Sequence, residues 1–145
     1  MRRLLTAVTL LLVFTATLAV PAQAAPSRYA YGSCGTSGFN ATFRVGYDPY
    51  GGRWAVKDIY VLLTPADGSR ISNNVDVSAF GVIPGWGHGN PRVTRNGQWT
   101  YFYSFPYQGG LPMPKGSGGR TGFNGRVIFD RFGSDPRCST TITLP

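Results

Sequence analysis

Apolar and polar residues alternate along much of the chain, and this period of two predicts β-strands. The alternation is clearest over residues 39–47, where polar Asn40, Thr42 and Arg44 separate the apolar positions. One face of this strand would carry Phe39, Ala41, Phe43, Val45 and Tyr47. A strand with one apolar and one polar face is typical of an antiparallel sheet that covers a core on one side.

Further segments follow the same rule. Residues 54–64 form a second predicted strand, and the stretch 59–63 is apolar on both faces, which favours a central position in a sheet. Residues 71–80 form a weaker candidate. Near the end of the chain, apolar residues alternate with polar ones at Phe123, Val127 and Phe129, and again at Cys138, Thr140, Ile142 and Leu144.

Glycine and proline separate these segments, for example in the predicted turns 48–52 and 65–69. We find no sustained helical period after the first two dozen residues. About seven strands with turns every 8–12 residues predict an all-β chain. The predicted fold is a single-domain antiparallel β-sandwich of immunoglobulin-like or jelly-roll-like type, and a small β-barrel is the alternative.

Asn96-Gly97 is the strongest hairpin signal, because both central residues of a type I′ turn need positive φ. A two-residue loop here would pair Arg95 with Gln98. One face of the predicted hairpin would then carry Arg92, Thr94, Trp99, Tyr101, Tyr103 and Phe105, and the other Val93, Thr100 and Phe102.

Two interpretations of this aromatic ribbon stay open. The rings can be core, with tyrosine hydroxyls at the sheet margin, or they can form an exposed platform suited to the flat faces of sugar rings. The segment Gly97-Gln98-Trp99-Thr100-Tyr101 resembles the Gly-x-Trp-x-Tyr strand of bacterial immunoglobulin-like domains, and that resemblance implies core. Trp86 and His88 lie in a glycine-rich stretch, residues 81–91, expected to be a loop that adds to the platform.

The first 24 residues have the layout of a secretory signal peptide. Arg2 and Arg3 precede an apolar run from Leu4 to Val20, and the Ala-x-Ala motif ending at Ala24 is a cleavage site. A membrane anchor is the alternative, but the apolar run is short for a span of roughly 20 residues. We therefore expect a secreted mature chain, residues 25–145, that forms one domain.

Cys34 and Cys138 are the only cysteines. In an exported protein they are expected to form a disulfide that ties the first structured segment to the last strand. A catalytic thiol is the alternative.

Removal of Arg2 and Arg3 leaves 12 basic residues against six aspartates, and the chain has no glutamate. The resulting net charge of +6 favours anionic partners such as cell-wall polymers. The basic residues are spread along the chain without a cluster, so no specific nucleic-acid site is predicted.

The residues available for catalysis are few. His88 is the only histidine, which argues against a zinc site, and no metal or cofactor is predicted. Asp58 and Asp130 lie on predicted strands, where partial burial can raise the pKa of a carboxyl group. The long glycine- and proline-rich connection 108–122 could present a segment to a partner protein.

These observations predict a secreted, non-catalytic binding module for polysaccharide or an anionic cell-envelope polymer. The predicted contacts are Trp99, Tyr101, Tyr103, Arg92, Trp86 and His88. An inhibitor or toxin-like protein that acts through the 108–122 connection is the alternative, and a hydrolase that uses His88 and an aspartate is a third candidate.

Overall fold

The structure is a computed structural model that describes residues 24–66, 72–81, 85–106, 109–115, 121–131 and 133–145. The predicted signal peptide therefore lies, apart from Ala24, outside the described residues. Within the described ranges, no helix is long and apolar enough to cross a membrane.

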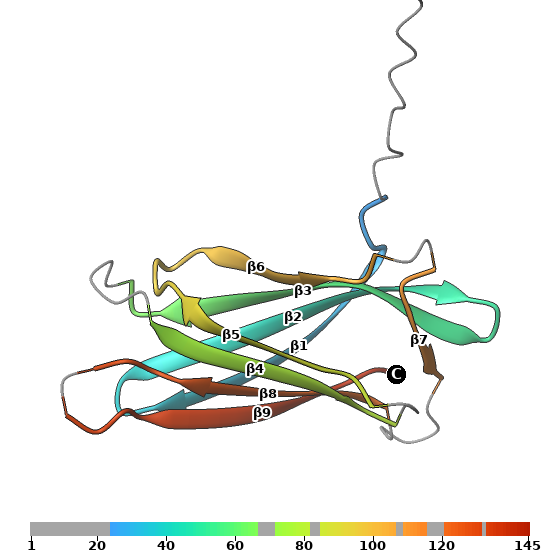
Figure 1. Ribbon diagram of the computed structural model, residues 1–145. Helices are drawn as coiled ribbons and strands as arrows, with labels where there is room; N and C mark the ends of the chain where they lie inside the picture. Colours follow the sequence, from blue (N-terminus) through green and yellow to red (C-terminus); the bar gives the residue numbers. More distant parts are fainter. Residues whose placement is uncertain (1–23, 67–71, 82–84, 107–108, 116–120, 132) are drawn as a thin grey trace, which may run out of the picture.

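Two antiparallel sheets pack face to face (Figure 1). In the five-stranded sheet the order is β1-β2-β3-β6, and β7 pairs with the same strand β3; the four-stranded sheet has the order β5-β4-β8-β9. The bounds are β1 Arg28–Thr36, β2 Phe39–Tyr50, β3 Arg53–Thr64, β4 Asn73–Phe80, β5 Gly87–Val93, β6 Trp99–Ser104, β7 Leu111–Pro114, β8 Gly122–Ile128 and β9 Arg137–Thr143.

The predicted β-sandwich is confirmed, and the sheets do not close into the alternative barrel. The strands predicted from alternation, in the regions of β2, β3, β4, β8 and β9, are all present. As expected, β3 is central, with β2 on one edge and β6 and β7 on the other.

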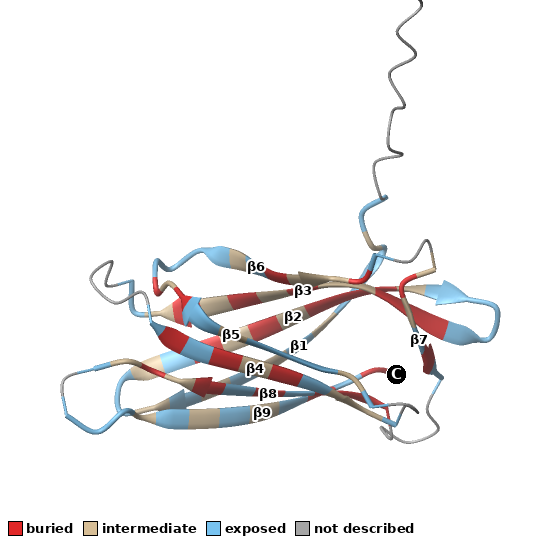
Figure 2. Cartoon of the chain, viewed as in Figure 1, coloured by how far each residue is buried: buried red, intermediate tan, exposed pale blue. Residues whose placement is uncertain are grey.

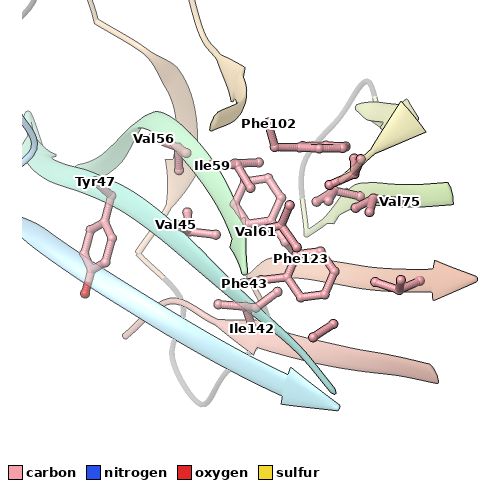
Figure 3. Close-up of a cluster of buried hydrophobic side chains, with 14 of the residues drawn as sticks. Phe43, Val45, Tyr47, Val56, Ile59, Val61, Val75, Phe102, Phe123 and Ile142 are labelled. Atoms are coloured by element: carbon pink, nitrogen blue, oxygen red, sulfur yellow. The ribbon is translucent and has the colours of Figure 1, made fainter. Parts of the chain in front are cut away.

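The core lies between the sheets and is built from the inward positions of both. Buried and exposed residues alternate along β4 and β8 (Figure 2). Figure 3 shows Phe43, Ile59, Phe102 and Phe123 converging from the two layers, and all four are buried. Burial of such large side chains stabilises the fold by roughly 1.5–3 kcal/mol each.

The predicted hairpin at Asn96-Gly97 is wrong, because β5 and β6 belong to different sheets. Val93 and Phe102 both point into the core, one from each layer, so the chain must cross the sandwich between them. The Asn96 side chain instead accepts a hydrogen bond from the backbone N–H of Gln98 at 3.0 Å. Such Asx turns are a common alternative use of asparagine in loops.

Two-residue hairpins with positive φ at both turn residues occur elsewhere. Ser37 and Gly38 join β1 to β2, and Gly51 and Gly52 join β2 to β3. Positive φ at both central positions is the signature of a type I′ turn, which matches the twist of the flanking strands.

The two long sides of the sandwich are held differently. On one side the predicted disulfide is present: Cys34 of β1 is bonded to Cys138 of β9, with the Cα atoms 5.7 Å apart. On the other side, β5 and β6 meet through aromatic rings, with His88 lying 5.3 Å from Phe102.

Two glycine-rich stretches expected to be loops contain strands. His88 lies on the edge strand β5, not in a loop. Leu111–Pro114 forms β7, which pairs with Arg53–Val56, so part of the 108–122 connection is built into the sheet. Residues 108 and 116–120 of that connection lie outside the described residues. Short edge strands tolerate glycine and proline because one side of the backbone makes no ladder hydrogen bonds.

Candidate functional site

The outer surface of the five-stranded sheet carries a continuous group of rings around one arginine. Register brings them together: Tyr31 of β1 is opposite Arg44 of β2, which is opposite Tyr60 of β3, which is opposite Tyr101 of β6. Rings from the rows on either side complete the group. We call this surface the aromatic face and define it as Tyr29, Tyr31, Arg44, Tyr60, Trp99 and Tyr101.

Four of the rings are well exposed. The exposed fraction is 41% for Tyr29, 56% for Tyr31, 37% for Trp99 and 54% for Tyr101. The rings also contact one another: the centroids of Tyr31 and Trp99 lie 6.3 Å apart, and those of Tyr60 and Tyr101 lie 5.6 Å apart. An exposed group of mutually packed rings is rare on a monomer surface and generally marks a binding site.

Arg44 is at the centre of the aromatic face. The carbon of its guanidinium lies 5.0 Å from the ring centre of Tyr29, 4.5 Å from that of Tyr60 and 4.9 Å from that of Trp99. These are cation–π distances. Its Nε is inaccessible to solvent and has no hydrogen-bond partner among the described residues, and its charge acts on the carboxylate of Asp58. Rings from three strands thus hold the guanidinium in place.

A β-bulge explains why the predicted aromatic ribbon is divided. Ile59 is opposite Tyr103 and the next residue, Tyr60, is opposite Tyr101, so Phe102 is the extra residue on β6. Phe102 is buried, and Tyr103 also packs against the core. Trp99 and Tyr101, before the bulge, point outward. Their exposure contradicts the core position implied by the resemblance to immunoglobulin-like strands.

Tyr103 belongs to a second group at the open edge between β5 and β6. Its ring lies 5.0 Å from Trp86 and 4.7 Å from His88. Trp86 also contacts Phe105, which is buried, at 4.9 Å. We call Trp86, His88 and Tyr103 the edge cluster. Its rings close the gap between the two sheets.

The six predicted contact residues therefore do not form one surface. Trp99 and Tyr101 lie on the aromatic face, whereas Trp86, His88 and Tyr103 form the edge cluster. Arg92 is exposed on β5, in the other sheet, and is not part of either group. The role of these six residues in binding stays a prediction.

A pocket of about 310 Å³ adjoins the aromatic face. It is lined by Ala24, Ala25, Pro26, Tyr29, Arg44, Lys57, Asp58, Tyr60, Tyr101 and Ser104. Burial raises the pKa of Asp58 above 3.8, although the Arg44 charge and a backbone hydrogen bond from Gly46 partly oppose this. The prediction that a strand carboxyl is partly buried with a raised pKa is thus confirmed for Asp58.

The hydrolase candidate needs His88 and an aspartate on one surface. His88 on β5 and Asp76 on the neighbouring strand β4 line the same pocket of about 610 Å³, where the carboxylate of Asp76 accepts a hydrogen bond from Arg126 at 2.6 Å. Within the described part of the chain, no three histidine, cysteine or acidic residues are grouped to hold a metal. The hydrolase stays an untested prediction.

Sequence reasoning missed Tyr29, Tyr31, Arg44 and Tyr60. The alternation of tyrosines at 29 and 31 indicated a strand with one aromatic face, and Tyr60 interrupts an apolar run at a position that must face outward if its neighbours are buried. Only the register of four strands shows that these residues meet.

Comparison of this chain with known protein families, with characterised proteins and with solved structures gave no match. The inference of function therefore depends on the aromatic face itself.

Proposed function

We propose that the protein is a secreted, non-catalytic binding module whose aromatic face binds an acidic polysaccharide. The observation that carries the proposal is the position of Arg44, whose guanidinium is surrounded by Tyr29, Tyr60 and Trp99 in the middle of the exposed rings.

The rings support a sugar ligand. A sugar ring has apolar C–H faces, and exposed aromatic rings such as Trp99 and Tyr101 offer flat apolar surface beside a polar hydroxyl or N–H group. Aromatic residues on β1, β3 and β6, with Arg44 on β2 between them, extend this surface across the sheet, so that successive units of one chain could contact different rings.

The charge supports an acidic ligand. A guanidinium presents five N–H donors in a plane and pairs bidentately with carboxylate or phosphate. Lys57 lines the adjoining pocket and adds a second cation, and the mature chain carries a net charge of +6. The Ala-x-Ala motif and the disulfide both favour a protein exported to an oxidising compartment where such polymers occur.

The test compares two polymers with the same backbone: polygalacturonate, and polygalacturonate whose carboxylates are methyl-esterified. We expect the protein to bind the acid more tightly than the ester, measured by calorimetry at low and moderate salt. Trp99→Ala is expected to weaken binding of both polymers by about tenfold, equivalent to about 1.4 kcal/mol. Arg44→Gln is expected to remove the preference for the acid.

Tyr50→Ala is the matched control, because Tyr50 is 65% exposed at the end of β2 and lies outside the aromatic face. Circular dichroism and thermal unfolding establish that each variant is folded. If Trp99→Ala and Tyr50→Ala bind both polymers as well as the unchanged protein, the aromatic face is not the binding surface.

A further inference from the structure

The segment that precedes β1 is docked against the aromatic face. The backbone N–H and the hydroxyl of Ser27 both donate to Oδ1 of Asp48, each at 2.7 Å. Pro26 packs over Gly46: a Cβ added there would come within 2.5 Å of the Pro26 Cγ. A side chain at position 46 would therefore displace the segment. The residues around the predicted cleavage site are thus held at a defined place.

That place is beside a carboxylate with one oxygen that lacks a hydrogen-bond partner. The same added Cβ would come within 2.3 Å of Oδ1 of Asp58, so Pro26 and this oxygen flank one spot. Oδ1 is inaccessible and accepts no hydrogen bond. Pro26 has no N–H with which to satisfy it. The next residues along the chain, Ala25 and Ala24, line the same pocket as Asp58.

Cleavage after Ala24 would change the group that faces this carboxylate. In the uncleaved chain the nitrogen of Ala25 is a neutral amide. After cleavage it is an α-amino group with an ordinary pKa of about 7.7–8.0, largely protonated at neutral pH and with three N–H donors. The other charged groups near Asp58 are Arg44, Lys57 and Asp48. A new cation here would pair with Asp58, because Oδ1 of Asp48 already accepts two hydrogen bonds from Ser27 whereas Oδ1 of Asp58 accepts none.

We propose that the α-ammonium group of Ala25, formed by signal-peptide removal, pairs with Asp58 and becomes part of the ligand pocket. The inference depends on the cleavage assumed in the proposed function. Pairing offsets the Asp58 charge, which leaves the Arg44 charge to act on an acidic ligand. The leader-bearing chain would lack this cation, so the complete pocket would exist only in the processed protein.

The test uses two folded proteins: one that begins at Ala25, and one in which a Gly-Ser dipeptide precedes Ala25 and moves the free amine away. Nuclear magnetic resonance titration follows the Asp58 carboxyl carbon and the α-amine without any ligand. In the protein that begins at Ala25, we expect the pKa of Asp58 to be lower by about one unit or more than in the extended protein. We expect the pKa of the α-amine to lie above its ordinary range of about 7.7–8.0.

Asp58→Asn should return the α-amine to its ordinary pKa, whereas Asp76→Asn, on the other sheet, should not. Equal Asp58 pKa values in the two proteins, or an ordinary pKa for the α-amine at Ala25, would overturn the ion pair. The unextended protein should also bind polygalacturonate several-fold more tightly than the extended one. Equal affinities of these two proteins for polygalacturonate would mean that the ammonium group is not part of the ligand site. The Trp99→Ala variant separately tests the aromatic face.

Discussion

The regular alternation of outward and inward side chains along β6 is interrupted by the bulge at Phe102. Tyr101 is exposed and belongs to the aromatic face, whereas its neighbour Phe102 is buried at the bulge and packs between the sheets. The two rings are of similar size, so their environments, more than their chemistry, decide what each contributes to stability.

We expect Phe102→Ala to lower the free energy of unfolding by about 3–5 kcal/mol, because it leaves a cavity in the core. Tyr101→Ala should change it by no more than about 0.5 kcal/mol, because that ring is already exposed to water. Urea unfolding followed by circular dichroism measures both. A large loss with Tyr101→Ala and a small one with Phe102→Ala would mean that Tyr101, and not Phe102, points into the core.

Individual residues also show how far the sequence allowed the inward or outward direction of each side chain to be predicted. The inward positions of β2 followed from alternation, since Ala41, Phe43 and Val45 had only one way to be buried together. The position of Tyr103 could not be predicted, because a bulge reverses the alternation and the sequence does not mark it. Arg44 was assigned only to a polar face; its rings come from three other strands.

At the scale of elements, the strands were easier to predict than the turns between them. Asn96-Gly97 has the residues of a type I′ hairpin, yet it leads across the sandwich, because the buried residues on its two sides belong to opposite layers. The hairpin signal is local, whereas the choice of sheet depends on the whole core. Ser37-Gly38, with a weaker sequence signal, forms the hairpin that sets β1 against β2.

The β1–β2 hairpin can be tested at Gly38. Its φ is +82°, and an added Cβ would have no heavy atom within 4 Å, so a substitution there changes backbone strain without a clash. We expect Gly38→Ala to lower the free energy of unfolding by about 1 kcal/mol, and Gly38→Asn to cost less, because asparagine tolerates this conformation better. Thermal unfolding compares the two. Equal stability of all three proteins would contradict the type I′ turn.

At the scale of the molecule, two different kinds of interaction hold the sheets together along their long sides. The disulfide joins β1 to β9, and the edge cluster lies between β5 and β6. Since β1 also carries Tyr29 and Tyr31, the disulfide fixes the strand that supplies part of the aromatic face. Stability and the proposed binding are therefore coupled on that side of the sandwich. On the other side they are separate, because the edge cluster contributes no ring to the aromatic face.

This coupling predicts different outcomes for the two sides. Replacement of Cys34 and Cys138 by serine opens a crosslink between residues 104 positions apart, and we expect the free energy of unfolding to fall by up to about 4–5 kcal/mol, as measured in urea. In the fraction that remains folded, polygalacturonate binding should weaken, because β1 is an edge strand that pairs within its sheet with β2 alone. His88→Ala, on the opposite side, should lower stability and leave binding unchanged. The prediction fails if the double serine variant keeps full stability. It also fails if His88→Ala weakens polygalacturonate binding more than the double serine variant does.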